Sequence, residues 1–211
     1  MTATTARGPI KALVVVTYIA MVAVNYLANA LPLNGRRTGD VSDAYPSLFT
    51  PAGLTFAIWG VIYLLLALHV LYQLGLFRGG ERSADRDALL NRVGLLFSIS
   101  SLANTAWVFA WHYDIIPLSA VLIVVILVCL ILINNTLRAA GLTGRERWLI
   151  GVPFSVYFGW TTVATIANIT VLLVSLHWNG FGLSESTWAT IIIVVGMLIG
   201  TATMLHNRDV A

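Results

Sequence analysis

Long apolar runs dominate this chain, and short polar stretches separate them. The runs show neither the alternation of a half-buried strand nor the one-sided stripe of a soluble helix. Each run is roughly twenty residues long, the length of α-helix that crosses the hydrocarbon core of a bilayer. The pattern therefore predicts an all-α polytopic membrane bundle, a single transmembrane domain over residues 1–211. Six helices are expected, at residues 12–31, 52–74, 88–111, 117–137, 148–176 and 187–205.

Composition agrees with this class of protein. Of the 211 residues, 58% are hydrophobic and 10% are charged, which excludes a soluble β-sandwich or α/β domain. The net charge is +3, but the basic residues stand at helix ends instead of forming a patch, so the expected partner is the lipid bilayer and not nucleic acid. The single cysteine, Cys129, excludes an intramolecular disulfide and a cysteine-cluster metal site.

The distribution of arginine and lysine predicts the topology. With the N-terminus inside, the inner side receives ten of these residues and the outer side two, which places both termini in the cytoplasm of a bacterial-type inner membrane. The long connection at residues 33–50 then lies outside. The ten inner residues are Arg7, Lys11, Arg78, Arg82, Arg86, Arg92, Arg138, Arg145, Arg147 and Arg208, and the two outer ones are Arg36 and Arg37.

The first apolar run also ends in Ala28-Asn29-Ala30, which fits a signal-peptidase site. The run is nevertheless long enough to span the bilayer itself, so we expect it to be retained. Asn25 and Asn29 share one of its faces, where they would form hydrogen bonds between helices. His69 lies well inside the second helix, and we expect it to be a neutral side chain hydrogen-bonded to a neighbouring helix.

Few residues of the predicted spans carry recognisable reactive chemistry. No Asp, Glu, Lys or Arg lies in the middle of a span, which argues against proton pumps, ion-coupled transporters and voltage sensors. The chain also lacks a phosphate-binding glycine loop, a zinc-binding H-E-x-x-H sequence and paired carboxylates within a helix. We therefore expect no catalytic residues, no metal site and no required cofactor.

Aromatic and asparagine side chains recur at helical spacing in three of the predicted helices. Their separation of three or four residues, and again of seven or eight, places each set on one helical face. The sets are Phe56, Trp59 and Tyr63; Asn104, Trp107 and Trp111; and Trp160, Ala164 and Asn168. Tryptophan offers a wide apolar plane with one donor, and asparagine offers a donor and an acceptor. Such faces would either surround a large, flat, mostly apolar ligand or pack the core of the bundle.

Three stretches that contain these faces carry a resemblance to a known family. They read P-S-L-F-T-P-A-G-L-T-F-A-I-W-G-V-I-Y at 46–63, N-T-A-W-V-F-A-W at 104–111 and Y-F-G-W-T-T-V-A-T-I-A-N at 157–168. In order and spacing the chain resembles the TspO/MBR family, the tryptophan-rich sensory or translocator proteins related to the mitochondrial peripheral-type benzodiazepine receptor. The resemblance covers residues 10–172 and implies a five-helix core, so the helix at 187–205 marks a divergent member.

The resemblance also implies a ligand and the residues that hold it. In the family the first loop closes over a pocket for porphyrins, with roles in tetrapyrrole and stress signalling, and some members bind sterols. Some members degrade porphyrin in light, for which Trp59 and Trp160 are the corresponding rings here. Carried over by position, the residues that line or support the pocket are Trp59, Tyr63, Asn104, Trp107, Trp160, Ala164 and Asn168.

Two departures from the family pattern bear on the ligand. The chain reads L-F-T-P-A at 48–52, where the family loop has a tryptophan followed shortly by two prolines, so closure of the loop and choice of ligand stay open. After Asn168 it reads I-T-V at 169–171, without the family's aromatic and basic residues, which disfavours sterol recognition.

The sequence therefore predicts a membrane sensor or binding protein that encloses a porphyrin or a similar planar apolar ligand. Three alternatives stay open: a transporter or exporter of small amphipathic molecules, a light-dependent porphyrin-degrading activity, and an assembly protein without a small ligand. The sequence does not choose among ligands or oligomeric states, and a homodimer is compatible with it.

Overall fold

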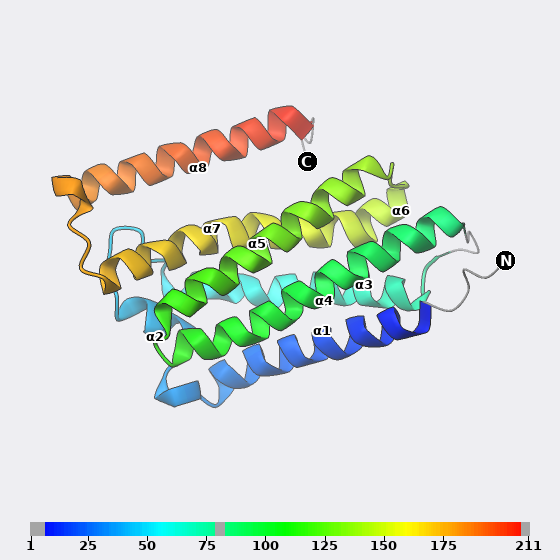
Figure 1. Ribbon diagram of the computed structural model, residues 1–211, viewed down its shortest axis with the longest axis horizontal. Coiled ribbons are helices and arrows are strands. Elements are labelled where there is room, and N and C mark those ends of the chain that lie inside the picture. The colour runs from blue at the N-terminus through cyan, green and yellow to red at the C-terminus, as the bar shows by residue number, and fades with distance from the viewer. Residues whose placement is uncertain (1–6, 79–82, 208–211) are drawn as a thin grey trace.

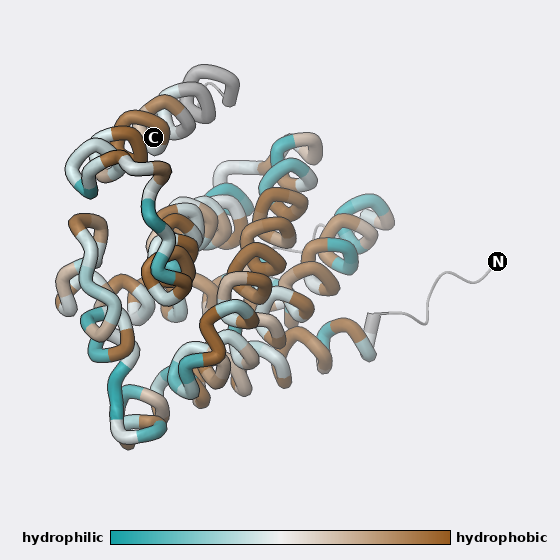
Figure 2. Tube along the Cα trace, turned by 60° about the vertical axis from the view of Figure 1, so that its left-hand side comes forward, coloured by the Kyte–Doolittle hydropathy of each residue, from teal (hydrophilic) through white to brown (hydrophobic). Residues whose placement is uncertain are grey.

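Five long helices form a bundle in the computed structural model, which describes residues 7–78 and 83–207 (Figure 1). All secondary structure in these ranges is helical, so the predicted all-α class is confirmed. Together with the turns that precede α3 and α7, all five are long and apolar enough to cross a membrane. Figure 2 shows hydrophobic residues along the helices and hydrophilic ones gathered near their ends. The chain is therefore a multi-pass membrane protein. The five helices are α1 (Arg7–Ala30), α3 (Ile58–Leu74), α4 (Ala84–His112), α5 (Ile116–Ala139) and α7 (Val152–Ser175).

The five helices close into a ring. Helix α1 packs against α4, α4 against α5, α5 against α7, α7 against α3, and α3 returns to α1. The centre of the ring is filled by large buried side chains, among them Met21, Phe97, Phe154 and Tyr157, each with no exposed surface. A polar group that points into this interior and finds no partner within the bundle is costly, because the surrounding hydrocarbon supplies none.

Helix α4 begins at Ala84 rather than at the expected residue 88. The reason is a local capping arrangement that precedes the apolar run. The Ser83 hydroxyl accepts a hydrogen bond from the Arg86 backbone N–H at 3.2 Å, and Asp85 and Asp87 lie in the first turn. Serine caps and early acidic residues both stabilise a helix N-terminus, so the helix extends into the polar connection.

The expected helix at 148–176 begins earlier and contains an irregular turn. It starts with the short α6 (Gly144–Glu146), where Thr143 and Glu146 form a capping box, and passes through a π-helical turn at Arg147–Gly151 before α7. Pro153 follows this turn directly. Proline lacks an N–H and its ring clashes with a carbonyl of the preceding turn, so the wider π turn accommodates it without breaking the span.

The connection between α1 and α3 contains short helices. These are η1 (Leu33–Gly35), α2 (Thr38–Asp43) and η2 (Gly53–Ala57). The predicted Asn34-Gly35 turn forms with positive φ at both residues, 54° and 74°. A side-chain clasp joins this connection to the end of α4. Its members are the Arg36–Asp114 ion pair, the Asn34 amide donating to the His112 carbonyl at 2.9 Å, and the Trp111 indole donating to the Thr38 carbonyl at 3.0 Å.

Helix α8 (Glu185–Asn207) follows a tight turn at η4 (Gly180–Gly182) and runs back beside the bundle (Figure 1). In the described ranges it does not pack along any of the five ring helices. It has 23 residues, a length comparable to that of α1 and α7. The sixth predicted helix therefore forms, but it stands apart from the ring.

Candidate functional site

Trp59 lies at the centre of an aromatic cluster inside the ring. Its ring centroid is 5.9 Å from that of Tyr63, 6.2 Å from Trp107, 6.1 Å from Tyr157 and 6.1 Å from Trp160. These side chains come from α3, α4 and α7, the three helices that carry the aromatic faces. The structure thus brings together four of the aromatic side chains predicted from spacing, Trp59, Tyr63, Trp107 and Trp160, together with Tyr157; these five rings are called the aromatic cluster below.

Local structure fixes the position of Trp59. The residue lies in the first turn of α3, directly after the 3₁₀ turn η2 that contains Phe56. One turn later, Tyr63 stacks on Trp59 at an interplanar angle of 21°. From α1, the Tyr18 hydroxyl donates to the backbone carbonyl of Tyr63 at 2.9 Å. The stacked pair is therefore held against α1 as well as within α3.

A chain of polar side chains lies beside the aromatic cluster. The Asn25 amide of α1 donates to the Asn104 side-chain oxygen of α4 at 2.7 Å, and the Asn104 amide donates to the Tyr157 hydroxyl of α7 at 3.4 Å. The expected hydrogen bonding of Asn25 between helices is confirmed. Because Asn104 is fully buried and bonded on both sides, it orients Tyr157 next to Trp59.

Asn168 and Ala164 lie further along α7. The Asn168 side-chain oxygen accepts a hydrogen bond from the Ser119 hydroxyl of α5 at 3.2 Å, and only 2% of Asn168 is exposed. Asn168 is eight residues from Trp160, which corresponds to roughly 12 Å along the helix axis. Ala164 lies between them, partly buried against the core. These residues extend the face of Trp160 away from the aromatic cluster instead of joining it.

Four of the predicted site residues carry buried polar atoms without a hydrogen-bond partner in the described ranges. They are the indole nitrogens of Trp107 and Trp160, the Asn168 amide nitrogen and the Tyr63 hydroxyl. A buried donor without an acceptor costs about 1–3 kcal/mol. Trp111 is different, because its indole donates to the Thr38 carbonyl and belongs to the clasp. The predicted site is thus rich in donors that an enclosed acceptor would satisfy.

His69 departs from its predicted hydrogen bond. Its ring is completely buried between Phe97 and Phe154, with centroids 5.3 and 4.7 Å away and both rings edge-on. Neither imidazole nitrogen has a partner among the described residues. The aromatic rings on α4 and α7 fill the space where a hydrogen-bonding group would have to lie, so His69 packs as an aromatic core residue.

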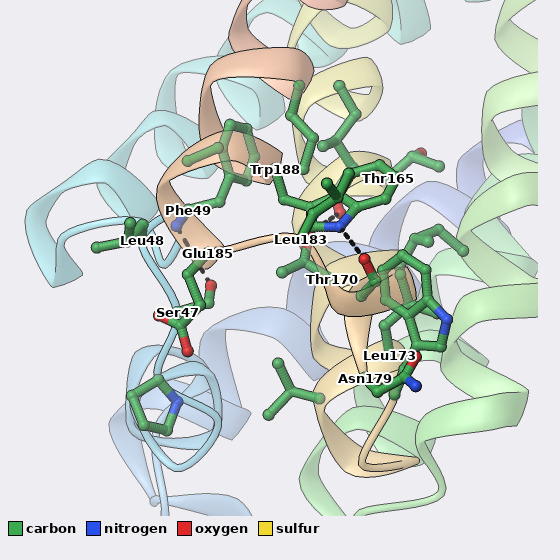
Figure 3. Close-up of a pocket in the computed structure, with 18 residues that line it drawn as sticks. Ser47, Leu48, Phe49, Thr165, Thr170, Leu173, Asn179, Leu183, Glu185 and Trp188 are labelled. Carbon is green, nitrogen blue, oxygen red and sulfur yellow. Dashed lines mark hydrogen bonds between the residues drawn. The ribbon is translucent and has the colours of Figure 1, made fainter.

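Residue spacing did not indicate two features of the structure, a fifth ring of the aromatic cluster and a second pocket. Tyr157 belongs to the aromatic cluster, and its spacing of three residues before Trp160 on one helical face was the available signal. The second is a pocket of about 560 Å³ on the other face of α7, close to α8 (Figure 3). None of the seven predicted site residues lines this pocket. Spacing within a single helix does not reveal a pocket that depends on where α8 stands.

Other site chemistry is sparse in the described part of the chain. No group of three or more His, Cys, Asp or Glu side chains there could hold a metal ion, and Cys129 is buried in the core. What the arrangement offers is stacking on flat apolar rings, combined with a few buried donors. This suits noncovalent binding of an aromatic ligand.

Comparison with known proteins identifies one family. A family model described as TSPO-like protein matches residues 11–211, which is nearly the whole chain and includes α8. The match therefore continues beyond residue 172, where the resemblance seen in the sequence ends. No curated protein and no solved structure matches the chain.

Proposed function

Because the chain belongs to the family of TSPO-like proteins, we propose that it is a membrane sensor or receptor that binds a porphyrin or a similar planar tetrapyrrole at the aromatic cluster. The observation that carries this proposal is the set of unpartnered donors inside the aromatic cluster, at Tyr63, Trp107 and Trp160, with a further one at Asn168 about 12 Å along α7. A tetrapyrrole combines a flat apolar surface with peripheral acceptors. It would therefore replace ring-to-ring contacts and supply partners to these donors.

Binding requires the aromatic cluster to open. Four rings surround Trp59 at centroid distances of about 6 Å, the separation of directly packed rings. We propose that Trp59 moves aside and stacks on the ligand. Its neighbour η2 belongs to the connection between α1 and α3, so movement of that connection would admit the ligand.

Quenching of intrinsic tryptophan fluorescence by a porphyrin tests this proposal in purified protein. We expect saturable quenching in the parent protein, and an affinity reduced roughly three- to tenfold in Trp59→Phe and Trp160→Phe, because the smaller ring loses stacking surface. Trp148→Phe is the matched control, since Trp148 is 71% exposed and lies outside the aromatic cluster. Absence of saturable quenching in the parent protein would refute the proposal.

The same samples separate the alternative functions. Net movement of porphyrin into protein-containing vesicles would identify a transporter, and a changed porphyrin absorption spectrum after illumination would identify photochemical degradation. A sensor shows binding with neither effect.

We further propose that the protein resides in a bacterial-type inner membrane with both termini in the cytoplasm, as the ten-to-two distribution of basic residues indicates.

A further inference from the structure

The pocket near α8 is a second candidate site, separate from the aromatic cluster. It has a volume of about 560 Å³ and lies between α7, the first turns of α8 and the segment Pro46–Phe49 (Figure 3). This volume falls within the usual range for small-molecule sites, roughly 300–1,000 Å³. The α7 residues that line it face away from Trp160 and Asn168, so a ligand here would not touch the aromatic cluster.

The pocket is elongated along the two helices and mainly apolar. Its lining on α7 extends from Thr165 to Val174, and on α8 from Glu185 to Ile192. At 1.5 Å per residue these stretches correspond to roughly 14 Å and 10 Å. Most of the side chains between these limits are aliphatic, including Ile166, Ile169 and Leu173. An elongated apolar pocket between two helices, called the slot below, offers contact along the length of an extended alkyl chain.

The turn between α7 and α8 keeps the two helices apart. The Trp188 indole of α8 donates to the Gly180 carbonyl at 2.8 Å and packs against Trp178 with a centroid distance of 5.0 Å. Gly180 has φ +62°, and a Cβ there would lie 3.0 Å from the Trp188 indole nitrogen. The gap is therefore maintained by a specific turn structure. Trp178 and Trp188 in this turn are typical of the membrane interface, where a protein contacts lipid head groups.

Polar side chains also line the pocket. Ser47, Asn179 and Glu185 are among its lining residues. Glu185 is the first residue of α8 and makes no ion pair with another described residue. The Glu185 carboxylate lies beside an apolar slot, near the expected level of the lipid head groups. It therefore complements an amphiphilic ligand with an alkyl chain and a cationic hydrogen-bond donor in its head group.

We propose that this pocket binds one acyl chain of a membrane phospholipid whose head group carries a primary amine, with the ammonium group at the Glu185 carboxylate. A primary ammonium donates hydrogen bonds to a carboxylate, a quaternary ammonium cannot, and an anionic head group is repelled. The expected order of affinity is therefore phosphatidylethanolamine, then phosphatidylcholine, then phosphatidylglycerol.

Native mass spectrometry of the full-length protein tests the proposal, with these three lipids carrying identical acyl chains. We expect one phosphatidylethanolamine per chain, bound about two- to fivefold more tightly than phosphatidylcholine, the factor expected for an exposed charge pair. Glu185→Gln should remove this preference while acyl-chain binding persists. Equal binding of the three lipids by the parent protein would overturn the proposal.

Two neighbouring isoleucines provide a matched pair of variants. Ile192 lines the pocket, whereas Ile193 does not and is 54% exposed. Ile192→Trp should fill the slot and abolish specific lipid binding, whereas Ile193→Trp should bind as the parent does. Unchanged helical content, measured by circular dichroism, shows that both variants fold. Retained lipid binding in Ile192→Trp would show that the lipid binds at another surface. A dimer that this substitution dissociates would show that a second copy of the chain, and not a lipid, covers this face of α8. Either result would overturn the proposal.

Discussion

At the scale of single residues, Gly94 lies where α4 packs tightly against two other helices. A Cβ at this position would lie 2.9 Å from the Gln73 amide nitrogen and 3.0 and 3.1 Å from methyl groups of Val14 and Ile10. These neighbours belong to α3 and α1, so Gly94 lets α4 approach both. Small residues at such crossings allow close packing in membranes, where no hydrophobic effect drives helices together.

We expect Gly94→Ala to destabilise the bundle by about 1–3 kcal/mol, because the methyl group overpacks this crossing. Reversible unfolding in mixed detergent micelles measures the change. Gly159→Ala is the control, since a Cβ at Gly159 in α7 would meet nothing within 4 Å. That substitution should be neutral, or stabilising by up to about 1 kcal/mol through helix propensity. Equal destabilisation by the two variants would contradict the packing argument.

The residue scale also shows how far the sequence could predict the site. Spacing within helices correctly indicated which faces carry Trp59, Trp107 and Trp160, because a helix has a fixed angular repeat. It could not indicate that His69 would lie between Phe97 and Phe154 without a hydrogen bond. That outcome depends on the relative rotation of three helices, which no single-helix pattern contains.

At the scale of elements, the clasp fixes the connection between α1 and α3 onto the end of α4. Burial raises the pKa of the Tyr45 phenol and the charge of Asp114 raises it further, so Tyr45 stays protonated. It donates to the Asp114 carboxylate at 3.4 Å, and Arg36 pairs with the same carboxylate. One exposed acidic side chain thus holds two parts of the connection.

Asp114→Asn should loosen the connection while the α4–α5 turn keeps its backbone. Asp114 has φ 56°, a conformation that asparagine also tolerates. Losing a partly exposed ion pair costs about 1 kcal/mol, so amide hydrogen exchange within Thr38–Asp43 should become roughly fivefold faster. Tyr113→Phe is the control, because Tyr113 is 53% exposed and is not part of the clasp. Unchanged exchange in Asp114→Asn would mean that the clasp does not hold this segment.

The ends of elements were the least predictable part of the fold. The apolar runs located the helices, but α4 extends to Ala84 and the last ring helix to Gly144, because Ser83 and Thr143 act as caps within polar connections. The short helix α2 is equally hidden, since it has only six residues and is held by the Trp111 indole, which donates to the carbonyl of its first residue, Thr38.

At the scale of the whole molecule, the arginine and lysine distribution makes a directional prediction. In a background in which the buried Cys129 is replaced by alanine, single cysteines can be introduced at Leu48 and Ala84, both exposed and near opposite ends of α3. A membrane-impermeant thiol reagent applied to intact spheroplasts should label Leu48→Cys and not Ala84→Cys. Permeabilised membranes should allow labelling of both. The reverse pattern in intact spheroplasts would place the termini outside.

Ring closure has a consequence for synthesis of the chain. Helix α3 packs against α1 and α7, and α7 is the last of the five ring helices to be made. At roughly 5–20 residues per second, the ribosome needs on the order of 5–20 s to continue from the end of α3 to the end of α7. During this interval Trp59 and His69 face lipid or transient neighbours instead of Trp160 and Phe154, which they contact in the finished ring. Four of the five ring helices have then been made, so the ring stays open until the fifth span has entered the bilayer, and the aromatic cluster is completed only at that moment.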